Sequence, residues 1–242
     1  DLARQAGIEN LSIDLIYGVP GQTVDSIQKT LDAVLPLGLS HLSLYCLTVE
    51  PGTSLYRDVN NGRIAPPDPD LAADQYDVVS ERLGAAGFDH YEISNWSKGN
   101  LDSQHNLAYW YNAEYLGLGA GSHGHAGGYR YHVIRTPRTY IKRLKNAPEH
   151  DGPYPISPAV ADSHPIPEDE EIADTIIMGL RLLKDGLHAE KFEKRFGKSL
   201  MQVHGPTIDE LIDLELLTWR NHALFLTEKG HFISNQVFHR FI

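Results

Sequence analysis

Two short apolar runs near the N-terminus enclose a segment with helical spacing. The runs are LSIDLIYGVP at residues 11–20 and HLSLYCLTV at residues 41–49. Apolar runs of this length, bounded by glycine or proline, indicate strands. Residues 23–37 place apolar side chains at steps of three and four residues, which is the spacing of one helix face. A strand, a helix and a second strand joined in this way predict a parallel βαβ unit whose strands are apolar on both faces.

A polar loop segment and a second segment with helical spacing follow. Residues 51–70 are rich in proline, glycine and asparagine, which predicts a loop. Residues 71–87 have helical spacing and end at a glycine, and residues 88–94, FDHYEIS, are typical of a short strand. The stretch SQHNLAYWYNAEYLGLGAGSHGH at residues 103–125 is glycine-rich and predicts mostly loop, with a brief strand or helix at residues 107–111. The order of these elements predicts an α/β fold.

The C-terminal part reads as a helical module that follows a proline-rich segment. Six prolines fall within residues 146–167, which predicts a linker. The last of them and the four acids after it begin a helix, because proline and acidic side chains favour the first helical turn. Shorter helical patterns at residues 189–196 and 206–216, a hairpin turning at residues 221–222 and a closing helix complete a winged-helix-like arrangement.

Length and composition are compatible with two domains of different type. The chain has 242 residues, of which 41% are hydrophobic, and this suits one large or two small domains. We predict a first domain at residues 1–145 and a mainly α-helical, winged-helix-like domain at residues 168–242, joined by the linker. The chain does not begin with Met and has no secretory leader, so we expect a fragment or a processed chain.

Charge and cysteine content narrow the partners. The net charge of −11 disfavours nucleic acid and anionic membrane surfaces as partners of a chain without a basic patch. The longest basic cluster, RTPRTYIKRLK at residues 135–145, is interpreted as the solvated face of one helix. No run of 18 apolar residues occurs that could cross a membrane. Cys46 is the only cysteine, so no internal disulfide can form, and we predict a cytoplasmic protein in which Cys46 packs within its strand.

Asp14 is unusual because it stands in the middle of an apolar strand. A buried carboxylate needs hydrogen-bond donors or a ligand, so Asp14 either caps a nearby loop or faces a cavity. Ligands bind at the carboxyl ends of parallel strands in barrels and in open sheets. Tyr17, Gly18, Thr48 and Glu50 fall at those ends and form one candidate rim.

A second candidate is a set of histidines after the glycine-rich stretch. On a strand, His123 and His125 would point the same way, as metal ligands require, and His132 would be a third ligand of a metal-dependent hydrolase. The neighbouring glycines favour a loop over a regular strand. GLGAGSHG also resembles a nucleotide-binding loop, but no clear helix follows it.

His105 lies in the sequence HNLAYW, beside two aromatic rings. A histidine in such a setting either packs or binds a ligand, and spacing alone leaves both interpretations open. Asn106 can fix a histidine tautomer or bond the backbone, while Tyr109 and Trp110 offer flat surfaces to a planar ring system. An imidazole with aromatic surfaces is what an iron porphyrin could use.

Five motifs in a fixed order resemble one protein family. They are DLIYGVPGQT, HLSLYCLTVEPGTSLY, HYEISNWS, HNLAYW and YLGLGAGSHG. In this order they resemble the oxygen-independent coproporphyrinogen III oxidase family of radical S-adenosylmethionine proteins, over essentially the whole chain. HNLAYW and EPGTSLY resemble the HemW-type heme-chaperone branch, because the oxidase branch lacks the HNxxYW pattern.

The resemblance implies a function and a set of residues. It implies a heme chaperone that delivers heme to client proteins, and a coproporphyrinogen III oxidase is the alternative. The resemblance leaves open whether the chain is an enzyme, whether it forms a homodimer and whether its clients are membrane-associated. His105 becomes the candidate axial ligand of heme iron, supported by Asn106, Tyr109 and Trp110. Four further residues fall on or near family positions on the S-adenosylmethionine side, and these are Asp14, Thr48, Gly121 and His123.

One family motif is missing. The three cysteines of the CxxxCxxC cluster motif do not occur in this chain, and neither does the glycine-rich segment for the methionine end of the cofactor. The resemblance therefore implies the C-terminal part of a partial TIM-type barrel, with a 4Fe–4S cluster and S-adenosylmethionine only in the full-length protein. Such a part would leave one barrel strand edge unpaired.

Overall fold

The computed structural model describes residues 2–147 and 153–242, which form two compact units. The first unit comprises the chain through Ser103 together with Leu182–Asp185, and the second comprises Gln104–Arg181 and Gly186–Ile242. Compactness thus divides the chain after Ser103, whereas the sequence pattern placed a boundary at residues 146–167; that division into domains stays a prediction.

A four-stranded sheet forms the centre of the first unit. Its order is β1-β2-β4-β3, with β1 parallel to β2 and the other two pairs antiparallel. The predicted βαβ unit is confirmed. The strands are β1 (Ser12–Tyr17), β2 (His41–Cys46), β3 (Asp89–Glu92) and β4 (Asn95–Ser97).

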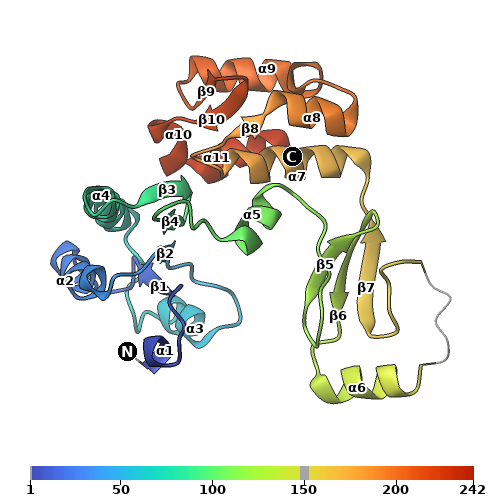
Figure 1. Cartoon of the computed structure of the whole chain (residues 1–242), viewed down its shortest axis with the longest axis horizontal. Coiled ribbons are helices and arrows are strands. Elements are labelled where there is room, and N and C mark those ends of the chain that lie inside the picture. The colour runs from blue at the N-terminus through green and yellow to red at the C-terminus, as the bar shows by residue number, and fades with distance from the viewer. Residues whose placement is uncertain (1, 148–152) are drawn as a thin grey trace. The chain divides into compact units, whose positions relative to one another are not determined.

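Helices cover one face of this sheet. Helix α2 (Val24–Val34) and helix α4 (Pro69–Ala85) pack side by side on it (Figure 1). Thr23 begins α2 by accepting a hydrogen bond from the backbone N–H of Ser26, while the Ser26 hydroxyl accepts from the backbone N–H of Thr23. The hydrophobic core between helices and sheet has as its most buried members Ile27, Leu31, Leu42, Leu44, Val79, Leu83 and Trp96.

The prediction of a loop at residues 51–70 is partly wrong, because this segment contains helix α3 (Ser54–Asn60). Thr53 caps that helix, since its hydroxyl accepts a hydrogen bond from the backbone N–H of Tyr56 at 3.1 Å. No residue of α3 is buried, so the segment lacks the apolar periodicity that reveals a packed helix. Two further short helices complete the unit, α1 (Leu2–Gln5) and the 3₁₀ turn η1 (Leu35–Leu37).

The second unit contains a three-stranded antiparallel sheet of order β5-β6-β7. The expected loop around the HxH pair is wrong, because β5 (His123–Ala126) is a regular strand paired with β6 (Tyr129–Val133). Gly124 is compatible with the strand because the Tyr131 ring occupies the space of a Cβ atom. The segment expected as a linker contains β7 (Val160–Pro165), paired with β6; its residues 148–152 lie outside the described part of the chain.

A second group of elements follows this sheet along the chain and continues to the C-terminus. The predicted hairpin at residues 221–222 is confirmed, because Asn221 and His222 turn the chain with φ values of 48° and 61°. A small sheet of order β8-β10-β9 and the helices around it form the expected winged-helix-like module. Its elements, with the two helices before it, are α5 (Gln104–Trp110), α6 (Pro137–Lys145), α7 (Glu168–Leu180), β8 (Leu187–His188), α8 (Ala189–Phe196), α9 (Leu200–Asp213), β9 (Leu217–Arg220), β10 (Ala223–Leu226), α10 (Glu228–Phe232), α11 (Ser234–Phe238) and η2 (His239–Phe241).

Candidate functional site

Asp14 is exposed, and its expected burial is wrong. Alternate residues of β1 point to opposite faces of the sheet, and the apolar set that includes Ile13 and Leu15 packs toward the helices. Asp14 therefore lies on the other face together with Ile16, and both side chains are exposed. An exposed carboxylate needs no protein partner, so Asp14 is available to a ligand.

Buried polar side chains accompany Asp14 on that face. The His41 imidazole bonds the Ser12 hydroxyl through Nδ1 and the Tyr91 hydroxyl through Nε2, each at 2.8 Å. Burial lowers the pKa of His41, and the nearby Asp14 carboxylate offsets only part of that effect. Glu92 is fully buried and accepts hydrogen bonds from the backbone of Ser94 and from the Asn95 amide. These buried side chains thus form a polar cluster held by internal hydrogen bonds, on the same face of the sheet as the exposed Asp14.

The candidate rim at the strand ends forms as expected in the first unit. The backbone N–H of Leu47 donates to the carbonyl of Tyr17 at 2.8 Å, which joins the carboxyl ends of β1 and β2. Gln75 of α4 is completely buried and accepts a hydrogen bond from the Gly18 backbone at 2.8 Å. Thr48 is exposed immediately beyond the end of β2. Thr48 therefore lies beyond the carboxyl end of the parallel pair, whereas Asp14 pairs with Ser43 in the middle of it.

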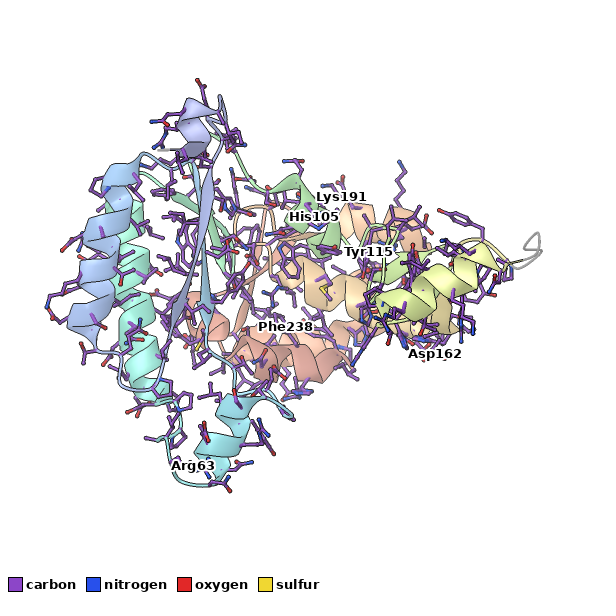
Figure 2. All side chains as sticks on the ribbon, turned by 90° about the horizontal axis from the view of Figure 1, so that it is seen from below. Arg63, His105, Tyr115, Asp162, Lys191 and Phe238 are labelled. Carbon is purple, nitrogen blue, oxygen red and sulfur yellow. The ribbon has the colours of Figure 1, made fainter. Side chains whose placement is uncertain are left out.

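HNLAYW forms helix α5 of the second unit, which is longer than the brief element expected at residues 107–111. His105 is exposed on this helix (Figure 2). The Tyr109 hydroxyl lies 3.1 Å from the Nε2 atom of His105. The helix places these two side chains together because residues four apart lie on one face. The Tyr109 ring meets the His105 ring edge-on at 4.9 Å and the Tyr115 ring edge-on at 4.7 Å. An accessible imidazole thus stands at the end of a row of phenol rings.

Trp110 has a different role from the open surface expected. The Arg181 guanidinium lies 4.2 Å from the centre of the Trp110 ring, so one face of the indole is already covered by a cation. Its indole N–H is buried and finds no hydrogen-bond acceptor among the described residues. Trp110 therefore fixes α5 to the rest of the second unit through its contact with Arg181, whereas the His105 side chain is exposed to solvent.

The carboxylate of Glu171, which the sequence did not indicate, connects several segments near α5. Glu171 of α7 lies 3.3 Å from Nε2 of His125, pairs with Arg195 and accepts a hydrogen bond at 3.2 Å from the amide of Asn112. Asn112 also donates to Thr175 at 3.0 Å. Burial alone would raise the pKa of the Glu171 carboxyl, but His125, Arg195 and Arg130 outweigh it and hold this pKa below its ordinary value. No sequence spacing could have indicated this set, because its members come from four separate segments.

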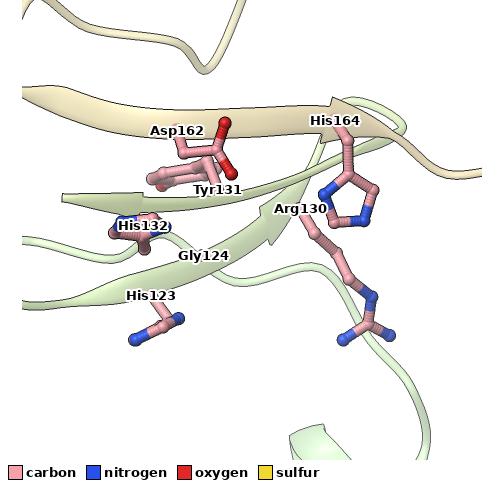
Figure 3. A pocket seen from close by; sticks show the side chains of 7 residues that line it. All are labelled: His123, Gly124, Arg130, Tyr131, His132, Asp162 and His164. Atoms are coloured by element: carbon pink, nitrogen blue, oxygen red, sulfur yellow. The ribbon is translucent and has the colours of Figure 1, made fainter.

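The two histidines of the HxH pair therefore have different surroundings. His125 is buried against Glu171, whereas His123 is exposed and lies opposite His132, with the two rings stacked at 5.6 Å. Figure 3 shows the shallow pocket of about 190 Å³ that results, lined by His123, Gly124, Arg130, Tyr131, His132, Asp162 and His164. Within residues 2–147 and 153–242, no group of three or more His, Cys, Asp or Glu side chains is placed to hold a metal ion.

The residues on the expected S-adenosylmethionine side fall in both units. Asp14 and Thr48 lie in the first unit, and Gly121 and His123 lie in the second. Gly121 has a φ of 80° and donates its N–H to the carbonyl of Ile134 at 3.0 Å. The chain does not fit a 4Fe–4S cluster of the family type, because Cys46 is its only cysteine and the cluster is bound by several thiolates.

The chain is similar to known proteins along its whole length. A family model described as the HemN C-terminal domain matches residues 166–233. The chain is 34% identical over 240 residues to heme chaperone HemW of Bacillus subtilis, covering 99% of this chain and 61% of that protein. It is 42% identical over 141 residues to heme chaperone HemW of Mycobacterium tuberculosis, covering 58% of this chain and 36% of that protein. It thus spans about three fifths of the Bacillus relative.

The fold is also similar to that of a solved radical S-adenosylmethionine enzyme. The structure of coproporphyrinogen III oxidase (HemN) from Escherichia coli superposes with a TM-score of 0.75 at 18% sequence identity, covering 99% of this chain and 56% of that one. The α/β fold class, as part of a radical S-adenosylmethionine barrel followed by a winged-helix-like domain, is confirmed by this similarity.

Proposed function

We infer from these similarities that the chain belongs to the family of HemW-type heme chaperones and HemN-like radical S-adenosylmethionine proteins. From this premise we propose that the protein binds heme and delivers it to client proteins. One observation carries the proposal: HNLAYW folds into a helix on which His105 is exposed while its neighbours anchor the helix. A chaperone needs such a ligand at its surface, because the cargo must enter and leave.

The chemistry of His105 suits an axial ligand of heme iron. A neutral imidazole nitrogen with a free lone pair is a common heme ligand. In the structure the Tyr109 hydroxyl shares the Nε2 atom, so iron can coordinate Nε2 only when this phenol moves away. A net hydrogen bond of this kind is worth about 1 kcal/mol, which weakens heme binding without preventing it. Reversible binding is what delivery requires.

The other residues of the motif support the helix in this proposal. Trp110 lies under Arg181 and fixes the C-terminal end of α5. Tyr109 lies between His105 and Tyr115 and orients the imidazole. Asn106 is half-buried on the same helix, next to His105 in the chain. The Glu171 network then holds the segment after α5, so the ligand stands on a supported element rather than on a free loop.

The radical cofactors of the family concern this chain only in part. We propose that Asp14, Thr48, Gly121 and His123 face S-adenosylmethionine in the full-length protein, as their positions in the family motifs suggest. S-Adenosylmethionine would supply radical chemistry there, and exposed Asp14 could accept a hydrogen bond from it. The thiolates for a 4Fe–4S cluster would have to come from other residues than those of this chain.

The partners follow from the proposed cargo. We infer that the protein acts in the cytoplasm and hands heme to heme-requiring clients, without nucleic acid as a partner. Membrane-associated proteins are candidate clients, and a homodimer is a candidate assembly. The described residues contain no helix that is long and apolar enough to cross a membrane. The single cysteine agrees with a reducing compartment.

Heme titration of the full-length protein tests this function. His105→Ala should weaken the shift of the Soret band and lower heme affinity at least tenfold, because an iron–nitrogen bond is lost. His239→Ala, which removes another exposed histidine of the second unit, is the matched control and should leave the titration unchanged. An unchanged titration of His105→Ala would remove His105 from the site. Formation of protoporphyrinogen by the anaerobically reconstituted protein would favour the oxidase alternative instead.

A further inference from the structure

The charge of this acidic chain is segregated at one helix. Helix α6 and the residue two positions before it carry five cations and no acid, namely Arg135, Arg138, Lys142, Arg143 and Lys145, although the whole chain has a net charge of −11. Net charge alone therefore hides a strongly basic surface.

Helix α6 is amphipathic but does not bury its apolar side chains. Such a helix normally packs its apolar stripe into a core. Here only Tyr140 packs on the small cluster of Tyr131, Val133 and Ala159, and no residue of α6 is buried. Ile141 is 49% exposed and Leu144 is 42% exposed.

The exposed apolar side chains lie among the cations. Ile141 stands three residues from Arg138 and Leu144 and four residues from Lys145, and residues at these steps share one side of a helix. The surface formed by Arg138, Ile141, Lys142, Leu144 and Lys145 is called here the α6 surface. It joins apolar side chains with flexible cationic ones on a single exposed helix.

The cations of the α6 surface are not neutralised within the described residues. Arg143 donates to the carbonyl of Val160 at 3.1 Å, but none of the α6-surface cations makes an ion pair with an acid in residues 2–147 or 153–242. With respect to the described residues, this positive charge is therefore directed to solvent and is available to an anionic partner.

A second exposed apolar group belongs to the same end of the sheet. Helix α6 lies across one end of the β5-β6-β7 sheet, as Figure 1 shows. The loop before β5 reaches this end, because the N–H of Gly121 donates to the carbonyl of Ile134 at 3.0 Å. Leu118 of that loop is 84% exposed.

We propose that the α6 surface docks on an anionic lipid bilayer, with Ile141 and Leu144 entering the headgroup region and the three cations contacting lipid phosphates. Cations beside exposed aliphatic side chains match the layered chemistry of a bilayer surface, which is charged outside and apolar beneath. A nucleic acid offers phosphates but no apolar layer for Ile141 and Leu144. The inference does not depend on heme binding.

The expected affinity can be bounded from the charge. Each Lys or Arg near an anionic surface contributes about a fivefold gain in binding, so the three cations of the α6 surface together give about a hundredfold preference over a neutral surface. A short helix with two apolar side chains adds little by itself, so binding should be reversible and sensitive to salt.

Vesicle flotation with the full-length protein tests the proposal. Wild type should float with vesicles of phosphatidylcholine and phosphatidylglycerol and stay behind with pure phosphatidylcholine, and molar salt should release it. Arg138→Glu/Lys142→Glu should lower the bound fraction by more than about thirtyfold at low protein, since two attractive charges are lost and two repulsive charges are introduced. Arg57→Glu/Lys194→Glu makes the same change of net charge at exposed positions elsewhere and should bind like wild type.

An apolar variant separates docking from simple charge attraction. Ile141→Ser/Leu144→Ser keeps every charge and should weaken binding to the anionic vesicles severalfold, while circular dichroism checks that the exposed substitutions leave the fold intact. Failure of wild type to float with anionic vesicles would overturn the proposal and leave an acidic protein partner as the occupant to test. Equal loss in the Arg57 and Lys194 control would also overturn it.

Discussion

The Glu171 network allows a quantitative prediction about the support of the heme-binding helix. Glu171→Gln keeps the shape of the side chain but removes its charge. In the native chain this carboxylate pairs with Arg195, lies 3.3 Å from His125 and accepts a hydrogen bond from Asn112. Glutamine can still accept from Asn112, so the loss concerns the two charged contacts.

The magnitude follows from burial. A hydrogen bond to a charged group contributes about 1.5–3 kcal/mol, and removing one member of a buried ion pair costs about 3–5 kcal/mol. Arg195 is about one third exposed, with a side-chain exposure of 34%, so its share must be reduced for solvent screening. We therefore expect Glu171→Gln to lower the free energy of unfolding by about 2–3 kcal/mol at pH 7.

The effect should depend on pH in a defined direction. The pKa of Glu171 is lowered in the folded chain from an ordinary value of 4.5. A carboxyl with a depressed folded pKa contributes stability that is present above 4.5 and is lost as pH falls through the folded pKa. The difference between wild type and Glu171→Gln should therefore shrink as pH is lowered below about 4.5.

Urea unfolding of both proteins measures this difference. Glu168→Gln is the matched control, because Glu168 lies on the same helix as Glu171. Glu168 pairs with Lys198 at 3.0 Å, but both of these side chains are about half exposed. This control should change stability by less than about 0.5 kcal/mol. A change below about 0.5 kcal/mol for Glu171→Gln, or the same change at all pH values, would refute the assignment of Glu171 as the centre of the network.

Three further predictions concern single side chains. Tyr109→Phe frees Nε2 of His105 and should tighten heme binding about fivefold in a Soret titration, whereas weaker binding would mean that Tyr109 assists coordination. Leu31→Ala in the fully buried core of α2 should lower the free energy of unfolding by about 2–5 kcal/mol in urea, and exposed Leu37→Ala should leave it nearly unchanged. Burial lowers the pKa of His231 to about 4, so NMR should find this imidazole neutral at pH 6, and its contribution to stability should fall as pH drops from 6.5 toward 4 because the unfolded chain binds the proton first.

The local sequence pattern correctly predicted those elements whose structure depends only on neighbouring residues. The parallel pair β1 and β2, helix α4 and the hairpin at Asn221 all follow from spacing and turn residues that lie within a few positions of one another. Helix α3 was missed because it buries no residue and so has no apolar period, although Thr53 offered a capping signal. The order of the five motifs also indicated the family resemblance, and the similarity to the HemW relatives confirms that resemblance.

The environment of each polar side chain could not be predicted in the same way. Asp14 was expected to be buried because its neighbours are apolar, but alternation along a strand defines two faces without saying which face the helices cover. His123 and His125 share one face of β5, yet only His125 is covered, because Glu171 and the Tyr115 ring reach that position alone. Both outcomes depend on elements far away in the chain.

The sequence by itself therefore determined the elements, their order and the family, since these depend on neighbouring residues and on motifs that can be read in line. Only the tertiary structure decided which side chains are free and which are paired. It left His105 exposed, covered Trp110 with Arg181 and placed Glu171 among three segments. The physical reason is that burial and charge pairing arise from packing between distant segments, and no local spacing encodes the partner that packing will bring.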